Sequence, residues 1–155
     1  MSTEISVNGL LAVERIALDV VVASMRPAFE EIGRIVQSRP GPTAAEIAQR
    51  LWMRELFSST ALGFGIALPH AHVHGLATPV AAFLRARAPI PFGSPDEQPV
   101  SEMLALLIPP GDTAARLELI ASFVQLFSEH GFRAALRQCR DAHSVWRLFD
   151  DRLRV

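Results

Sequence analysis

The sequence predicts an α/β fold, a sandwich in which helices cover both faces of a β-sheet. Three apolar runs flanked by Pro and Gly clusters have the length of strands, and they span Gly65–Leu68, Pro79–Arg85 and Met103–Ile108. Helix-type patterns lie before, between and after the strand-type runs, which is typical of helices on both sheet faces. The 155 residues, 50% of them hydrophobic, suffice for one domain over residues 1–155 with a sizeable core.

The chain is expected to open with a short entry segment, a strand and a helix. Ile5–Leu11 predicts an extended or single-turn entry, and Arg15–Val21 predicts a short strand. Ser24 can cap a helix over Met25–Gln37, whose apolar residues recur at i, i+3 and i+4 on one face. This helix therefore buries one face.

A break and a second helix come next. Arg39-Pro40-Gly41-Pro42 interrupts the first helix. Thr43 and Glu46 have the spacing of a capping box, which predicts a helix that ends near Leu56. Further on, the Pro- and Gly-rich stretch Pro89–Asp96 predicts a long surface loop between two strands.

The C-terminal third is predicted to be helical. Asp112 or Thr113 caps a helix to about Ser128, and shorter helices follow near Gly131–Arg137 and Ala142–Leu153. The residues expected to face inward on the first of these helices are Leu117, Ile120, Val124 and Phe127.

Composition narrows the classes of function. The formal net charge is −1, so nothing drives the chain toward nucleic acid or an anionic membrane. All 15 basic residues are arginine and no tyrosine is present, which excludes a Schiff-base lysine, a Walker-type lysine and a tyrosine acid. The lone Cys139 suits a reducing compartment. The start lacks a signal-peptide pattern, and Ile16–Met25 is too short to span a bilayer. We expect a cytoplasmic protein.

The stretch Ser59–His72 carries most of the groups with chemical uses. Its apolar run ends on Pro69 and His70, and the proline limits the freedom with which the chain enters the histidine. Imidazole has an ordinary pKa near 6.5, so the neutral, nucleophilic form of His70 is easy to reach. Gly63 and Gly65 can bring backbone amides close to an anion. His70 is therefore the candidate nucleophile, against the alternative of a polar strand-end residue.

Other polar residues could bind the same anion. Arg54 could fork onto phosphate oxygens, or it could be a solvated residue at the end of a helix. Ser59 and Thr60 could donate hydroxyl hydrogen bonds, or they could merely terminate that helix. Arg116, in the first turn of a later helix, opposes the helix dipole unless an anion or acid lies near.

His72 and His74 raise a metal alternative. On an extended strand, His70, His72 and His74 would share one face, and three imidazoles can hold a catalytic zinc. Gly75 follows at once, so the strand is expected to end near Pro69, and no carboxylate lies close in sequence as a second shell. We therefore expect no metal, with His72 in the wall of the site and His74 in an exposed loop.

These residues resemble a known family. The segment from Arg54-Glu55 through Ser59-Thr60-x-x-Gly63-x-Gly65 to Ile66-Ala67-Leu68-Pro69-His70-Ala71 resembles the active-site signature of fructose/mannitol-type (type 2) enzyme IIA proteins of the bacterial phosphotransferase system. Pro89-Ile90-Pro91-Phe92, Gln98-Pro99-Val100 and Ala105–Pro109 resemble its later strands and loop, and the opening segment also fits. A chain of this length that starts in this way looks most like the nitrogen-regulatory branch.

The resemblance implies a mixed sheet flanked by helices and a phosphorelay. In that relay a histidine phosphocarrier, charged from phosphoenolpyruvate, passes its phosphoryl group to the residue matching His70. Arg54 and Thr60 would assist the transfer, Ser59, Gly63, Gly65, Arg116 and His72 would contact the phosphate, and no cofactor or metal is required. The apolar rim that would dock the phosphocarrier consists of Leu62, Phe64 and Leu76. Regulatory targets would be sensor kinases or potassium transporters.

Two departures from the family pattern stand out. Many members carry a second histidine early in the helix after the Pro-Gly turn, where this chain has Arg116, which cannot shuttle a proton. His72 and His74 also stand where arginine, lysine or non-basic residues are more usual. The alternatives are therefore a binding module that has lost phosphotransfer, an enzyme IIA component of fructose-type sugar transport and, more distantly, a metal hydrolase built on the three histidines.

Overall fold

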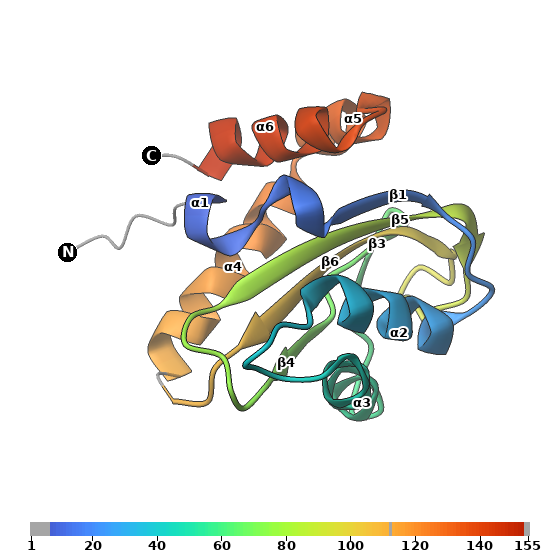
Figure 1. The fold of residues 1–155 in the computed structure, drawn as a ribbon. Coiled ribbons are helices and arrows are strands. Elements are labelled where there is room, and N and C mark those ends of the chain that lie inside the picture. The colour runs from blue at the N-terminus through green and yellow to red at the C-terminus, as the bar shows by residue number, and fades with distance from the viewer. Residues whose placement is uncertain (1–6, 112, 154–155) are drawn as a thin grey trace.

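The computed structural model describes residues 7–111 and 113–153, and a β-sheet of six strands within those residues forms its centre (Figure 1). The strands are β1 (Ile16–Val20), β2 (Ala61–Gly63), β3 (Ile66–Ala67), β4 (His70–His72), β5 (Val80–Ile90) and β6 (Val100–Ile108). The strand order is β1-β5-β6-β3-β2. The strand β4 also pairs with β6, at residues that follow those paired with β3. The β1–β5, β3–β6 and β4–β6 pairs are parallel, whereas β5–β6 and β2–β3 are antiparallel, so the sheet is mixed.

Helices cover both faces of this sheet, as the sequence predicts (Figure 1). α2 (Met25–Val36) and α3 (Ala44–Glu55) lie on one face. The other face carries α1 (Val7–Leu10), the 3-10 turn η1 (Val13–Arg15), α4 (Thr113–Ser128), α5 (His130–Gln138) and α6 (Ala142–Leu153).

Two hydrophobic cores result, one on each side of the sheet. Along β5, Ala81 and Phe83 belong to the core beneath α4–α6, and the alternate residues Ala82 and Leu84 belong to the core beneath α2 and α3. Side chains of a strand alternate between faces, so a strand buried on both sides is apolar throughout. This burial explains why the central strands are continuous apolar runs in the sequence.

The predicted helix starts are confirmed in part. The Thr43 hydroxyl accepts from the amide of Glu46, and the Glu46 carboxylate accepts from the amide of Thr43, which completes the capping box of α3. Ser24 does stand at the N-cap of α2, but its side chain makes no capping hydrogen bond. Val7–Leu10 forms the single turn expected of the entry segment, whereas Ile5 and the alternative cap Asp112 lie outside the described residues.

The strand prediction around the signature was wrong in detail. The expected strand Gly65–Leu68 is only Ile66–Ala67, and a separate strand, β4, begins at His70. The strand expected at Pro79–Arg85 extends to Ile90, and Phe92 in the expected surface loop is buried. Proline residues at 89 and 91 obscured this extension, because proline is uncommon inside strands.

The orientation of α4 was also mispredicted. Phe127 is buried and Ile120 packs partly against the core, but Leu117 is 57% exposed and Val124 is 41% exposed. The buried residues of α4 are Leu119, Phe123, Leu126 and Phe127. This helix is apolar on several sides, so its periodicity permits more than one inward stripe.

Among the residues that the structure describes, no helix has the length and apolar character needed to cross a bilayer.

Candidate functional site

β4 presents His70 at the edge of the sheet. It pairs in parallel with β6, with His70 opposite Leu106, and the Leu106 amide donates to the Pro69 carbonyl at 2.8 Å. Ala71 is buried, whereas His70 is half-buried and His72 is exposed. Alternation along the strand therefore places both imidazoles on the face opposite Ala71. The expectation that the strand ends near Pro69 was wrong, because pairing with β6 continues it through His72.

The His70 ring is held in one tautomer. Its Nδ1 lies 2.9 Å from the carbonyl oxygen of Leu68, and a carbonyl can only accept, so Nδ1 carries the hydrogen. Burial lowers the pKa of His70 below its ordinary value, and the positive charges of Arg54 and Arg116 lower it further, against the effect of the Leu68 bond. The neutral ring then carries its free lone pair on Nε2, the nitrogen suited to act as a nucleophile.

A cavity of about 490 Å³ surrounds His70. Residues of α3 and the segment after it, of β4, of the end of β6 and of the first half of α4 line this cavity. The lining residues are Arg50, Met53, Arg54, Phe57, His70, Ala71, His72, Ile108, Arg116, Leu117 and Ile120. The site thus combines a half-buried imidazole, three arginines and several apolar side chains.

The structure brings four of the predicted site residues together. Arg54 and Arg116 reach the cavity of His70 from α3 and α4, and His72 lines it from β4. Arg54 Nη1 donates to the Ser58 carbonyl at 3.0 Å, which fixes the guanidinium near the end of α3. The Arg116 guanidinium lies against the His72 ring, with Nη1 at 3.3 Å from Nδ1 and in contact with Nε2.

Ser59 and Thr60 lie outside that lining and have structural partners. The Thr60 hydroxyl and amide both donate to the Glu55 carboxylate, at 2.7 and 2.8 Å, and Thr60 is buried. The Ser59 hydroxyl donates to the Phe92 carbonyl at 3.1 Å and accepts from the Ala61 amide. These bonds fix the segment between α3 and β2.

Glu55 is a residue whose role sequence reasoning missed. Burial raises the pKa of this carboxyl, and its two bonds from Thr60 oppose the rise. The bonded pair holds the end of α3 against the start of the signature, so it positions Arg54 without lining the cavity.

The two glycines serve a turn at a distance from His70. Gly63 and Gly65 flank Phe64 in the hairpin between β2 and β3, and all three residues have a positive φ. The Phe64 amide donates to the Asp96 carboxylate at 3.0 Å instead of facing His70. Ile66, the residue after Gly65, pairs with Glu102 of β6, whereas His70 pairs with Leu106. These two positions are four residues apart along β6, which is about 13 Å. The prediction that Gly63 and Gly65 bring backbone amides to an anion at His70 was therefore wrong.

The apolar rim also differs from the predicted one. Leu62, Phe64 and Leu76 do not line the cavity, and Phe64 instead lies under the Arg133 guanidinium. The actual rim consists of Met53, Phe57, Leu117 and Ile120. Arg50, Met53, Arg54 and Phe57 are spaced at i, i+3, i+4 and i+7, which is the one sequence signal that could have revealed three of the missed residues.

Metal coordination finds no support in the described part of the chain. There, no group of three or more His, Cys, Asp or Glu side chains is arranged to hold a metal ion. His72 contacts Arg116, and His74 lies beyond β4 in a turn. The zinc alternative therefore has no geometric basis at His70.

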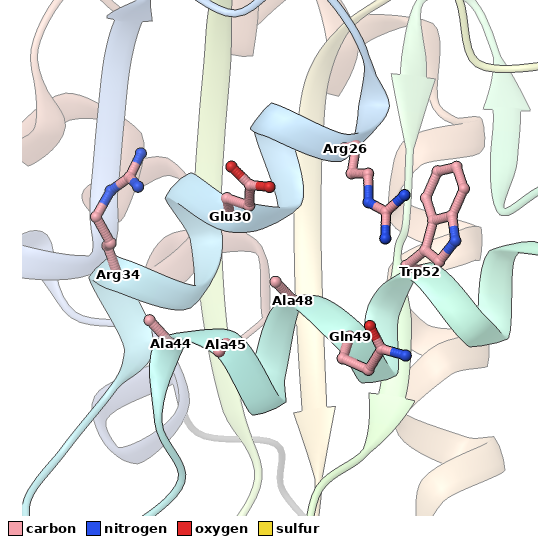
Figure 2. Close-up of a pocket in the computed structure, with 8 residues that line it drawn as sticks. All are labelled: Arg26, Glu30, Arg34, Ala44, Ala45, Ala48, Gln49 and Trp52. Atoms are coloured by element: carbon pink, nitrogen blue, oxygen red, sulfur yellow. The ribbon is translucent and has the colours of Figure 1, made fainter.

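A separate groove of about 340 Å³ lies between α2 and α3 (Figure 2). Arg26 stacks over the Trp52 ring at 4.8 Å from its centroid, and the small residues Ala44, Ala45 and Ala48 form part of the lining. None of its lining residues belongs to the His70 cavity. The groove marks where the two helices pack closely.

Comparison with known proteins identifies the class of this fold and site. Residues 9–152 match the model of the family described as the phosphoenolpyruvate-dependent sugar phosphotransferase system, EIIA 2. The chain belongs to this family of phosphotransferase enzyme IIA proteins, as the resemblance implies.

Within the family, the chain is similar to nitrogen regulatory proteins. It is 31% identical over 140 residues to that of Bradyrhizobium diazoefficiens, which covers 90% of this chain and 92% of the relative. It is 30% identical over 148 residues to the nitrogen regulatory protein of Pseudomonas aeruginosa, and this match covers 95% of this chain and 96% of the relative. The crystal structure of nitrogen regulatory protein IIA-Ntr from Neisseria meningitidis superposes with a TM-score of 0.87 at 32% identity, over 92% of this chain and 97% of that one.

Proposed function

We propose that His70 accepts a phosphoryl group from a histidine phosphocarrier in a phosphoenolpyruvate-dependent relay, and that its phosphorylation state regulates other proteins. Membership of the enzyme IIA family supports a phosphoryl-carrier and regulatory role. The single observation that carries the residue assignment is the half-buried His70, fixed by Leu68 and flanked in one cavity by Arg54 and Arg116.

The transfer follows from the tautomer. The lone pair of His70 Nε2 attacks the phosphorus in line, the new N–P bond forms, and the N–P bond of the phosphocarrier breaks. The donor ring, whose other nitrogen carries a hydrogen, leaves as a neutral imidazole, and the phosphorylated His70 ring takes over its positive charge. Nδ1 keeps its hydrogen and its bond to Leu68, so the ring does not rotate during the reaction. Phosphoryl transfer of this kind needs positioning and neutralisation of charge more than covalent assistance.

The two arginines supply the neutralisation. Arg54 and Arg116 reach the cavity from different helices, α3 and α4, and guanidiniums can fork onto phosphate oxygens. The same charges favour the neutral, nucleophilic state of His70. In this proposal Thr60 and Ser59 act by positioning the chain, His72 acts through its contact with Arg116, and Gly63 and Gly65 form the distant hairpin.

The donor would dock on the apolar rim. Phe57 is 88% exposed, and Met53 and Leu117 are exposed beside it in the wall of the cavity. Exposed apolar residues of this kind mark interaction sites when they cluster. A phosphocarrier seated there would place its phosphohistidine over His70, and such a relay would operate in the cytoplasm.

The regulatory output rests on the relatives. Two nitrogen regulatory proteins match this chain at 31% and 30% identity over 140 and 148 residues, whereas a fructose-specific component matches at 26% over 92 residues. We therefore favour control of target proteins, such as sensor kinases or potassium transporters, over delivery of phosphate to a sugar permease.

The test is phosphate incorporation followed by intact mass under alkaline conditions. Wild type, His70→Ala and Arg54→Gln are incubated with phosphoenolpyruvate, the cognate first enzyme and the phosphocarrier. We expect one acid-labile phosphate on wild type, none on His70→Ala and a slower rate for Arg54→Gln. If wild type takes up no phosphate while a control acceptor in the same reaction is labelled, the carrier function is refuted. That result would favour a binding module that uses the same face.

A further inference from the structure

Glu55 is a buried carboxylate that follows Arg54 in the chain but lies outside the cavity of the candidate site. It is the last residue of α3, and it is 9% exposed. It does not line the His70 cavity, and no ion pair among the described residues includes it. A buried carboxylate without an ion-pair partner is costly unless hydrogen bonds stabilise it, so its hydrogen bonds indicate what it does.

The two hydrogen bonds of Glu55 close a loop of the chain. Its carboxylate oxygens accept from the Thr60 amide at 2.8 Å and from the Thr60 hydroxyl at 2.7 Å. The four residues between them, 56–59, are exposed, whereas Thr60 is buried. The bonds therefore anchor Thr60 to the end of α3 across an exposed loop. The Ser59 hydroxyl also joins this loop to the Phe92 carbonyl, through a bond that does not involve Glu55.

Thr60 in turn holds Leu68, whose carbonyl contacts the imidazole. The Leu68 amide donates to the Thr60 carbonyl at 3.0 Å. The peptide that follows Leu68 has no N–H, because residue 69 is proline. The carbonyl of this peptide accepts from His70 Nδ1 at 2.9 Å. Its orientation therefore depends on the hydrogen bonds on its two sides, which are the bond to Thr60 and the bond from the Leu106 amide to the Pro69 carbonyl.

We propose that Glu55 is a positioning residue that fixes the tautomer of His70 from outside the cavity. It acts through the hydrogen-bonded chain that runs from Thr60 to Leu68 and then to the imidazole. This chain keeps the hydrogen on Nδ1 and so leaves the lone pair on Nε2, the nitrogen that attacks phosphorus in the proposed transfer. The inference rests on the proposed function of His70, but the tautomer itself can be measured without any transfer.

Two variants separate the reach of the Glu55 side chain from its charge. Glu55→Gln keeps the reach, because its carbonyl oxygen can accept from the Thr60 amide and its NH₂ group can donate to the Thr60 hydroxyl. Glu55→Asp keeps the charge but is one methylene shorter, so it cannot contact both Thr60 donors in this geometry. Since the role is positional, Glu55→Gln should behave as wild type and Glu55→Asp should not. Glu30→Asp makes the same change at an exposed residue of α2 and is the matched control.

The first experiment records long-range ¹H–¹⁵N correlation spectra of the histidine rings in the full chain, at about pH 8, where imidazole is neutral. A ring nitrogen that carries a hydrogen differs widely in ¹⁵N shift from one that carries a lone pair, and His70→Gln assigns the His70 signals by their loss. We expect the hydrogen on Nδ1 in wild type, Glu55→Gln and Glu30→Asp, and a mixture of both tautomers in Glu55→Asp. If Glu55→Asp keeps the wild-type tautomer, or if wild type carries the hydrogen on Nε2, the inference is overturned.

The second experiment measures the single-turnover rate of phosphate uptake from the phosphocarrier. The rate of Glu55→Asp should fall about tenfold or more, whereas Glu55→Gln and Glu30→Asp should stay within about threefold of wild type. Equal losses in Glu55→Asp and Glu55→Gln would assign the effect to charge and would overturn the inference. An undiminished rate in Glu55→Asp would also overturn it and would leave the function of His70 intact. If wild type takes up no phosphate, the proposed function fails, and the tautomer of Glu55→Asp still decides the inference.

Thr60→Val provides a second variant in case Glu55→Asp does not fold, which far-UV circular dichroism shows. It removes the hydroxyl bond to Glu55 and retains the amide bond. The tautomer of His70 should therefore shift in the same direction as in Glu55→Asp, but to a smaller extent. A wild-type tautomer in a folded Thr60→Val, beside an unfolded Glu55→Asp, would overturn the inference.

Discussion

Replacing Gly33 with alanine should destabilise the fold through a single contact between α2 and α3. A Cβ atom at Gly33 would lie 2.3 Å from the carbonyl oxygen of Ala44, the first residue of α3. Real Cβ atoms essentially never approach closer than 3.0 Å, so the helices would have to separate locally by about 0.7 Å. The obstacle is backbone, so it cannot rotate out of the way.

The expected magnitude follows from two opposing effects. Overpacking of a well-packed contact costs about 1–3 kcal/mol. Replacement of a helical glycine by alanine returns up to about 1 kcal/mol. The free energy of unfolding of Gly33→Ala should therefore fall by about 1–2 kcal/mol, which corresponds to roughly 2–8 °C in Tm for a domain of this size.

Gly131→Ala provides the matched control. Gly131 lies in α5, and a Cβ atom added there would meet nothing within 4 Å. The same substitution should therefore be neutral or should stabilise the chain by up to about 1 kcal/mol. Urea unfolding of both variants, followed by far-UV circular dichroism, measures the difference. If Gly33→Ala is as stable as Gly131→Ala, then α2 and α3 do not pack as closely as the structure shows.

Three further predictions concern polar groups. Arg85→Gln leaves the carboxylate of Glu102, which is 2% exposed, without its main partner and should cost about 3–5 kcal/mol in urea unfolding. Arg87→Gln breaks an exposed pair and should leave the urea midpoint close to that of wild type. Thr60→Val removes a buried hydroxyl donor to a carboxylate and should cost about 1–3 kcal/mol by the same assay, and an unchanged midpoint would contradict the bond. The folded pKa of His70 is lowered by burial, so its contribution to stability is present above the unfolded pKa of about 6.5 and is lost as the pH falls through the lower folded pKa. His70→Gln should therefore lose less stability than wild type between neutral and mildly acidic pH, and parallel stability–pH curves would refute this reasoning.

The sequence predicted the parts of the fold that depend on local chemistry. The capping box of Thr43 and Glu46 could be predicted because both partners lie within one helical turn. The strand pattern identified the sandwich because strands buried on both faces must be apolar throughout. His70 could be singled out because the proline before it and the apolar run limit its environment.

The sequence could not predict which groups meet in space. Gly63 and Gly65 lie close to His70 in the chain, but the segment from Ile66 to His72 runs along β6 in one continuous register, so the hairpin and His70 lie toward opposite ends of β6. The inward face of α4 could not be chosen either, because Leu117 and Phe123 belong to competing apolar stripes. These arrangements depend on long-range packing, which no local pattern encodes.

The position of the site at the edge of β4 makes it depend on both halves of the sandwich. Arg54 belongs to α3, which packs on the core beneath α2 and α3, and Arg116 belongs to α4, which packs on the opposite core. Neither layer alone carries both cations, and β4 is held to the sheet by β6. The charges that favour neutral His70 therefore converge only when both cores have formed on the same sheet. A displacement of either layer, such as the one expected for Gly33→Ala on the α3 side, should therefore also slow the proposed transfer of a phosphoryl group to His70.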